Sequence, residues 1–363
     1  MKSIRLISLI LAVILALPAL CACRHEDGEE EHSFGVWTIE SAPGYDTKGV
    51  LVRRCSDPDC GKTERREIYA SKDLSYTEKD GEIYLSGIGQ CGDGFLYIAS
   101  VTPDGKKLRG IGHSAFTDDK NVEFVYIEDG VEEICGYAFS GCSALRSARL
   151  PEKCELFEAG VFLSCTALES VSLPKNIKTL PESCFDGCGA LETLDLPDGI
   201  TILENSAFNL CTSLQTLALP EGLTAIGSNC FDGCAALETI ESKLGDGRLP
   251  KTLRNVGSYA FADCASLRAI SFYMPLDELG FCVFTGCTSL ERVFLSKEIA
   301  HISAPNGKSP FIGANAQAKI VTNAGEKPDG WDEFFAVYDY IDAKDKDTEY
   351  LYLTVEYNSE VLS

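Results

Sequence analysis

Apolar residues recur through the middle of the chain with a fixed period. From Ile111 to Ile302 the sequence repeats a segment that opens on Ile or Leu, passes through Phe and Cys, and closes on Leu-x-x-Leu-x-Leu-Pro or a close variant. The lead positions are 23 residues apart, except for one step of 30. They are Ile111, Ile134, Phe157, Leu180, Leu203, Ile226, Val256, Leu279 and Ile302. Self-similarity at such a period predicts a stacked-repeat solenoid with one coil per repeat.

Each repeat predicts a parallel strand. In the segment Leu145-Arg-Ser-Ala-Arg-Leu150 we assign Leu145, Ala148 and Leu150 to the interior and the residues between them to the outside. Such short apolar runs suit strands, and the Pro that follows ends each one. A second short strand is predicted at Thr224–Ile226 and its equivalents. The Ala-Phe-x-Gly-Cys segment has no room for a long helix, so it predicts one helical turn or a tight bend.

Phe and Cys each hold a fixed place in the repeats. Coils stacked at the strand spacing of about 4.8 Å would join the Phe rings into one internal column. The Phe residues are Phe116, Phe139, Phe162, Phe185, Phe208, Phe231, Phe261 and Phe284. The Cys residues are Cys142, Cys165, Cys188, Cys211, Cys234, Cys264 and Cys287. A regular ladder points its Cβ vectors in parallel rather than at each other, so we expect buried thiols and no disulfides.

The N-terminus predicts export and a lipid anchor. Residues 1–22 join a short basic start to an apolar run, which is typical of a signal peptide and too short for a confident membrane span. Leu20-Cys-Ala-Cys23 resembles a bacterial lipobox, which implies lipidation at Cys23; simple cleavage is the alternative. Residues 23–33 read as an acidic tether and resemble the export signal of Bacteroidetes lipoproteins. The expected location is the bacterial outer membrane or cell surface, with membrane contact only through the lipid.

Residues 34–105 depart from the period and predict a β-rich N-terminal module or cap. Two β-rich runs around the turn near Cys55 and Cys60 predict a hairpin. For these cysteines we consider a Cys55–Cys60 disulfide, free thiols, or a zinc site that also needs His32 and the distant Cys91. The solenoid itself is predicted over 106–305, and a C-terminal cap over 306–363.

Charge and motif content exclude several functions. The net charge of −23 argues against binding nucleic acid or an anionic membrane surface through a basic patch. The repeats contain no recognisable paired carboxylates, nucleotide loop or metal-ligand spacing, so we predict no catalytic residue, no cofactor and no metal. A catalytic Cys is disfavoured because the chain has only four His, and His113 and His301 lie at opposite ends of the solenoid.

The repeat motif resembles a known family. Ile-Gly-x-x-Ala/Cys-Phe-x-x-Cys-x-x-Leu-x-x-Val/Leu-x-Leu-Pro is similar to the BspA-like (Treponema pallidum type) leucine-rich repeat. The resemblance implies a β-rich leucine-rich repeat solenoid with parallel strands and short helical turns. It also implies a secreted or surface-anchored bacterial protein without catalysis, which adheres to host matrix proteins or to neighbouring cells.

Outward side chains on the predicted strands form two columns that we take as the candidate binding face. They are hydroxyl-rich and mixed in charge, with few of the aromatic and Arg residues that dominate protein interfaces. A merely solvated face is the alternative. A second functional hypothesis, a glycan-binding or nutrient-capture accessory, would need an aromatic platform that these columns lack. The candidate residues are Ser147, Arg149, Ser170, Ser172, Thr193, Asp195, Thr216, Thr239, Glu241, Tyr273, Arg292 and Phe294.

Overall fold

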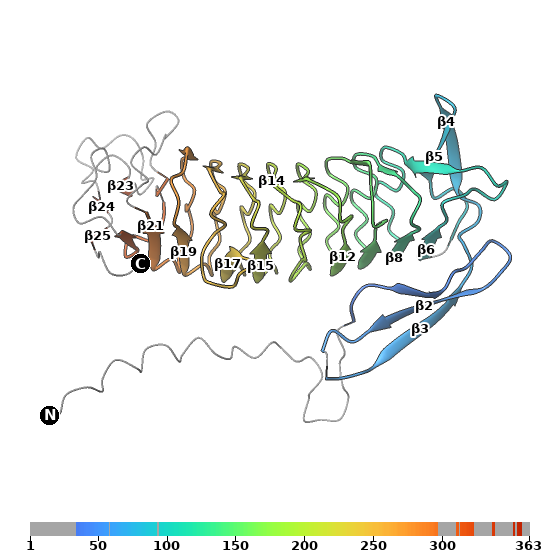
Figure 1. Ribbon diagram of the computed structural model, residues 1–363, viewed down its shortest axis with the longest axis horizontal. Helices are drawn as coiled ribbons and strands as arrows, with labels where there is room; N and C mark the ends of the chain where they lie inside the picture. Colours follow the sequence, from blue (N-terminus) through green and yellow to red (C-terminus); the bar gives the residue numbers. More distant parts are fainter. Residues whose placement is uncertain are drawn as a thin grey trace.

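The computed structural model describes residues 34–57, 59–92, 94–296, 310–311, 313–322, 336–337, 351–352 and 354–357. The predicted signal peptide, the lipidation site Cys23 and the acidic tether lie outside these residues, as does most of 306–363. Within the described part, the chain forms an elongated stack of coils with a small separate sheet beside one end (Figure 1). None of the described segments is a helix long and apolar enough to cross a bilayer.

A first ladder of parallel strands runs along one side of the stack. Its strands pair in a register of one repeat, so that Ser147 faces Ser170 and Thr216 faces Thr239. This register confirms the predicted solenoid of 23-residue coils. The first ladder comprises β6 (Phe95–Ile98), β8 (Phe124–Ile127), β10 (Ser147–Arg149), β12 (Ser170–Ser172), β15 (Thr216–Leu219), β17 (Thr239–Ser242), β19 (Ala269–Phe272), β21 (Arg292–Leu295), β22 (Lys319–Thr322) and β25 (Thr354–Tyr357).

A second ladder, formed mostly of two-residue strands, runs along another side, as the sequence predicted at Thr224–Ile226. It begins with β4 (Ser75–Lys79) antiparallel to β5 (Glu82–Gly87), and β5 pairs in parallel with the next strand. The rest are β7 (Leu108–Ile111), β9 (Glu133–Ile134), β11 (Leu156–Phe157), β13 (Thr179–Leu180), β14 (Ile202–Leu203), β16 (Ala225–Ile226), β18 (Asn255–Val256) and β20 (Glu278–Leu279). The ladders therefore start with β5 and β6, ahead of residue 106.

The Phe column forms as predicted. Successive rings from Phe116 to Phe284 lie nearly parallel, with centroids 5.0–6.1 Å apart, and Phe311 extends the column by one ring. Each of these side chains is at most 2% exposed. We call these nine rings the Phe spine. Because full burial of a Phe side chain contributes about 1.5–3 kcal/mol, the Phe spine is a main source of cohesion between coils.

The seven repeat cysteines are buried thiols, as predicted, and each has a polar partner. Cys165 Sγ donates to the Phe139 carbonyl at 3.0 Å, and Cys188 Sγ donates to the Phe162 carbonyl at 3.2 Å. The other five make the same bond to the spine Phe of the preceding coil. The thiol is small enough for the interior and gives a buried carbonyl a second donor.

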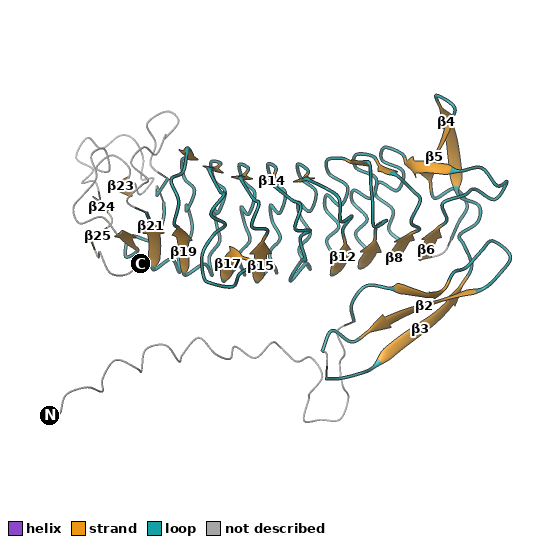
Figure 2. Cartoon of the chain, viewed as in Figure 1, coloured by secondary structure: helices purple, strands orange, loops and turns teal. Residues whose placement is uncertain are grey.

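The segment around each spine Phe is a tight turn, so the predicted short helical turns are wrong. In one coil, the N–H groups of Tyr137, Phe139 and Gly141 donate to carbonyls of the following coil, while those of Ser140 and Cys142 donate three residues back. A helix needs consecutive N–H groups to bond within their own segment, and this alternation prevents that. Figure 2 shows strands and loops but no helix in the described part of the chain.

A three-stranded antiparallel sheet covers the outer side of the first coils. It consists of β1 (Thr38–Ser41), β2 (Gly49–Arg54) and β3 (Thr63–Ile68), and β2 and β3 form the predicted hairpin. The sheet lies beside the end of the stack that carries β6 and β8 (Figure 1). Cys55 and Cys60 lie in the connection between β2 and β3, whereas Cys91 packs against the solenoid core. The Cys55–Cys60 disulfide stays a prediction.

The coils keep their path where the backbone pairing lapses. The first ladder has no assigned strand at 191–196, between β12 and β15, although the sequence predicts one there. Leu191, Leu194 and Leu196 are nevertheless buried like their equivalents. At the far end, β22 and β25 continue the first ladder, and β23 (Ala336–Val337) pairs with β24 (Leu351–Tyr352).

Candidate functional site

The candidate binding face lies along the first ladder, and only part of it is open to solvent. Thr193, Asp195, Thr216, Thr239 and Arg292 are exposed. Ser147 is buried, and the remaining candidates are half-buried: Arg149, Ser170, Ser172, Glu241, Tyr273 and Phe294. The open part therefore begins after β12 and extends toward β21.

The same face carries aromatic side chains at its N-terminal end, which sequence reasoning did not assign to it. Phe95 stacks on Phe124 at 5.5 Å between ring centroids, and Tyr97 stacks on Tyr126 at 5.0 Å. Trp37 lies edge-on to both phenylalanines. These contacts place the sheet of β1–β3 over the first coils. The alternation of aromatic and aliphatic residues in Phe95–Ile98 and Phe124–Ile127 is the signal that could have revealed this.

Two candidate anchors on the face already have partners within the chain. The Arg149 guanidinium lies 4.8 Å from the Tyr126 ring centroid and donates to the Ile127 carbonyl at 2.8 Å and to Asp129 at 2.9 Å. Tyr273 lies under the Arg248 guanidinium, 4.0 Å from the ring centroid. Of the Arg and aromatic residues among the candidates, Arg292 and Phe294 are therefore left as possible contacts for a partner.

Residues 242–248, which lie in the one repeat step of 30 residues, form an ordered loop at the edge of the face. The Ser242 N–H donates to the Arg248 carbonyl and closes the loop. Lys243 reaches back two coils, where its Nζ donates to Asp195 at 3.1 Å and to Asp198 at 2.8 Å. Lys243 thus crosses the coil that lies between, so the loop stabilises one edge of the open surface.

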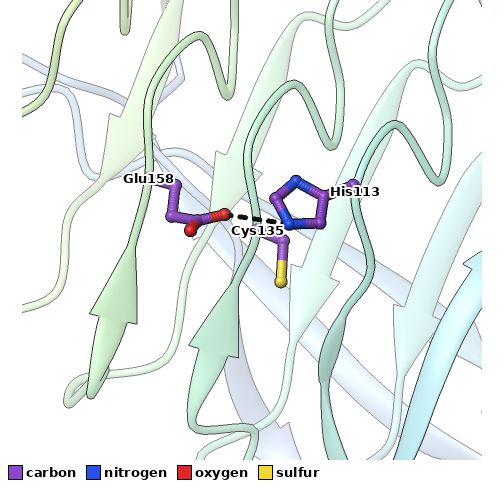
Figure 3. Close-up of side chains that lie close together, drawn as sticks. All are labelled: His113, Cys135 and Glu158. Atoms are coloured by element: carbon purple, nitrogen blue, oxygen red, sulfur yellow. Dashed lines mark ion pairs between the residues drawn. The ribbon is translucent and has the colours of Figure 1, made fainter. Parts of the chain in front are cut away.

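On the second ladder, the coils bring together three side chains of the kinds that bind metals. His113, Cys135 and Glu158 come from three consecutive coils, and their ligand atoms all lie within 4.8 Å of one another. His113 Nε2 lies 3.5 Å from Glu158 Oε2, as Figure 3 shows. Sequence reasoning expected no metal-ligand cluster in the repeats, because spacings of 22 and 23 residues match no short motif. The signal was positional: Cys135 and Glu158 directly follow their lead residues.

The cluster has a mixed environment. Cys135 is only 6% exposed, Glu158 is half-buried, and His113 lies at the surface. Burial, aided by the charges of Glu158 and Glu133, raises the pKa of the Cys135 thiol to about 11. A protonated thiol is a poor nucleophile, so the nearness of His113 does not make Cys135 a hydrolase nucleophile.

A cavity of about 460 Å³ adjoins the cluster. His113, Tyr137, Phe157, Glu158 and Pro181 contribute to its lining. It lies where the second ladder is interrupted between β11 and β13. A small ligand or a water molecule bound at the cluster would therefore have room beside it.

Comparisons with known proteins concern the solenoid. The family model described as "BspA type Leucine rich repeat region" matches in 6 copies over residues 109–238 and 240–305. No curated protein matches the chain. Among solved structures, the T. pallidum leucine-rich repeat protein is similar at 22% identity over 54% of this chain and 88% of its own, with a TM-score of 0.47. A leucine-rich cell surface protein from Faecalibacterium prausnitzii is similar at 18% identity over 70% and 76%, with a TM-score of 0.39.

Proposed function

The chain belongs to the BspA type leucine-rich repeat family, whose model covers more than half of it, and from this premise we propose that it is a cell-surface lipoprotein that binds other proteins. Its binding surface is the open part of the first ladder, from Thr193 to Arg292, and it acts without catalysis. The partners are proteins of a host matrix or of neighbouring cells. The chain contacts the membrane only through a lipid at Cys23.

One observation carries the choice of surface. The sheet of β1–β3 covers the outward side chains of β6 and β8, through contacts of Trp37 and Leu51 with Phe95 and Tyr97. Beyond β12, the exposed Thr193, Thr216 and Thr239 continue the same column, and no described part of the chain covers them as the sheet covers β6 and β8. An extended row of strand side chains is the kind of surface that solenoid proteins use for binding.

The chemistry of this row supports a protein ligand more than a glycan. Short hydroxyl side chains lose little conformational entropy on contact, which suits a flat protein epitope. Arg292 and Phe294 at the C-terminal end of the row provide the two side chains best able to anchor a partner. The aromatic side chains that a glycan platform would need pack beneath Trp37 instead.

The proposal is tested with immobilised host matrix proteins and the purified mature chain. Saturable binding that persists at moderate salt is the expected result. Thr216→Arg combined with Thr239→Arg should weaken that binding by about tenfold or more, because two long side chains would stand in the centre of the surface. Thr212→Arg is the matched control, since Thr212 is exposed in the same coil as Thr216 but lies in a turn.

Two results would count against the proposal. The absence of binding across a broad panel of matrix and bacterial surface proteins would remove the adhesive role. Binding that Thr212→Arg weakens as much as the paired variant does would move the interface off the first ladder. Saturable binding on a glycan array in place of protein binding would favour the nutrient-capture alternative.

A further inference from the structure

The cluster of His113, Cys135 and Glu158 has the composition and spacing of a metal centre. We propose that these three side chains bind one Zn²⁺ ion at the N-terminal end of the second ladder, with a fourth position open to water. An imidazole nitrogen, a thiolate and a carboxylate oxygen are all ordinary zinc ligands. The thiolate and imidazole favour zinc over the hard cations Mg²⁺ and Ca²⁺, which prefer shells made of oxygen.

The distances fit a tetrahedral ion after small rotations of the side chains. Nitrogen and oxygen ligands at tetrahedral positions around zinc lie about 3.4 Å apart. The observed separation of His113 Nε2 and Glu158 Oε2 is 3.5 Å. All three ligand atoms lie within 4.8 Å of one another, so they are within reach of a shared ion without movement of the coils. Figure 3 shows the His113 ring and the Glu158 carboxylate facing each other, with Cys135 between them on the middle coil and its sulfur turned away from the line that joins them.

Cys135 differs from the repeat cysteines in a way that points to a ligand. Each repeat cysteine donates its thiol hydrogen to a Phe carbonyl of the preceding coil, as Cys142 does to Phe116. Among the described residues, the Cys135 thiol is more than nine-tenths buried and has no hydrogen-bond acceptor; Cys184 and Cys230 share this property, but only Cys135 lies beside an imidazole and a carboxylate. A metal ion would replace the thiol proton and give this buried sulfur the strong partner it lacks.

The residue after Cys135 packs closely against the next coil and orients the carboxylate. A Cβ on Gly136 would lie 3.3 Å from the Ala159 carbonyl oxygen, which is tighter than most real contacts, and 3.5 Å from His113 Nδ1, which is an ordinary van der Waals contact. The N–H of Gly136 donates to Glu158 Oε2 at 2.7 Å. Such an outer hydrogen bond fixes a liganding carboxylate, as is usual in metal sites.

The cavity between β11 and β13 is lined in part by His113 and Glu158, so it leaves room for a fourth ligand beside them. Three protein ligands and one open position is the arrangement in which a bound water, or a donor from a partner, completes the shell. Because the ligands come from three coils, the ion would also cross-link the first repeats. Zinc should therefore stabilise the N-terminal end of the solenoid by mass action.

The test uses the full chain produced without a polyhistidine tag. Titration calorimetry should show one equivalent of Zn²⁺ bound, and Co²⁺ in its place should give the near-ultraviolet charge-transfer absorption of a cobalt–thiolate bond. Cys135→Ser should abolish that absorption. His113→Ala and Glu158→Gln should each weaken zinc binding by at least about tenfold, since loss of a direct ligand costs no less than loss of an outer hydrogen bond. Zinc should raise Tm for the unaltered chain and not for His113→Ala.

A matched control distinguishes this site from the other sulfur ligands. The double variant Cys55→Ser, Cys60→Ser leaves the cluster untouched and should bind zinc as the unaltered chain does. Since His113 lies at the surface, His113→Ala should fold normally even if Cys135→Ser does not. The proposal is overturned if the unaltered chain binds no zinc at micromolar concentration. It is equally overturned if His113→Ala keeps full affinity while the Cys55, Cys60 double variant loses it.

Discussion

Pro181 lies beside the Phe157 carbonyl, at the position where the neighbouring coils have a residue whose backbone N–H donates to the equivalent carbonyl. The N–H of Glu158 donates to the Ile134 carbonyl, and the N–H of Glu204 donates to the Leu180 carbonyl. Proline has no N–H, so the Phe157 carbonyl lacks this bond of the ladder. The second ladder is interrupted at this coil, between β11 and β13, and the cavity beside the His113 cluster lies there. Pro181 thus accounts for one of the hydrogen bonds that are missing at this break, which is one of several breaks in the two ladders.

Replacing this proline should close the ladder. In Pro181→Ala the new N–H can donate to the Phe157 carbonyl, and hydrogen exchange should show its amide protected as strongly as that of Glu204. Global stability should change by less than about 1 kcal/mol, because the new hydrogen bond is offset by greater freedom of the unfolded chain. An amide at position 181 that exchanges as fast as an exposed one would show that Pro181 is not the cause of the gap.

Truncating the Phe spine should be costly. Phe185 is fully buried, with Phe162 and Phe208 each 5.6 Å away between ring centroids. Phe185→Ala should lower the free energy of unfolding by about 3–5 kcal/mol, measured by urea denaturation. Leu210→Ala, which removes a half-exposed side chain in the next coil, should change it by no more than about 0.5 kcal/mol. Equal effects of the two variants would contradict a continuous buried column.

The regular part of the fold could be predicted from the sequence because each coil repeats the same pattern of inward and outward residues. Once Leu145, Ala148 and Leu150 were assigned inward, the equivalent residues of later coils followed at steps of one period. The Phe spine and the buried cysteines are consequences of that register. Equivalent residues of successive coils point in the same direction. Assigning one residue to the interior therefore assigns the whole column of its equivalents.

The candidate sites could be predicted only in part, because they depend on contacts between coils. Arg149 was a plausible anchor in its own strand, but its guanidinium lies over Tyr126 of the previous coil and pairs with Asp129. His113 was considered only for its distance from His301, and Cys135 was not considered at all, since neither belongs to a motif. The alternation of hydrogen bonds that prevents helical turns is likewise a property of stacked coils, which local sequence does not express.

Lipidation at Cys23 is tested directly in cells. In the full chain, Cys23→Ala should remove incorporation of an alkynyl fatty acid and shift the protein from the membrane fraction to the soluble one. A lipid chain contributes about 0.8 kcal/mol per buried CH₂ group, so its loss should abolish stable anchoring. Cys21→Ala is the matched control and should stay in the membrane fraction. Membrane association of Cys23→Ala equal to that of the unaltered chain would point to another anchor.

The buried thiols should make the solenoid sensitive to alkaline pH. Burial raises the pKa of Cys142 and of Cys287 to about 12, from an ordinary value of 9.0, and holds those of Cys188, Cys211 and Cys264 well above it. Above pH 9 the unfolded chain loses these protons while the folded chain keeps them. The unfolded state then binds fewer protons, so stability is complete below pH 9 and falls between pH 9 and 12.

The slope of stability against pH measures this effect. Each such thiol should lower the free energy of unfolding by about 1.4 kcal/mol per pH unit within that window. In the double variant Cys188→Ala, Cys211→Ala, urea denaturation should show a slope shallower by about 2.8 kcal/mol per pH unit, because two thiols are lost. Tyrosines and lysines also titrate between pH 9 and 12, but they are unchanged in this variant, so the difference in slope reports the thiols. Its stability at pH 7 should fall by about 1 kcal/mol per lost thiol bond, since the Phe carbonyls keep a backbone donor. An unchanged slope would mean that the cysteines ionise in the folded chain, which burial in the core should prevent.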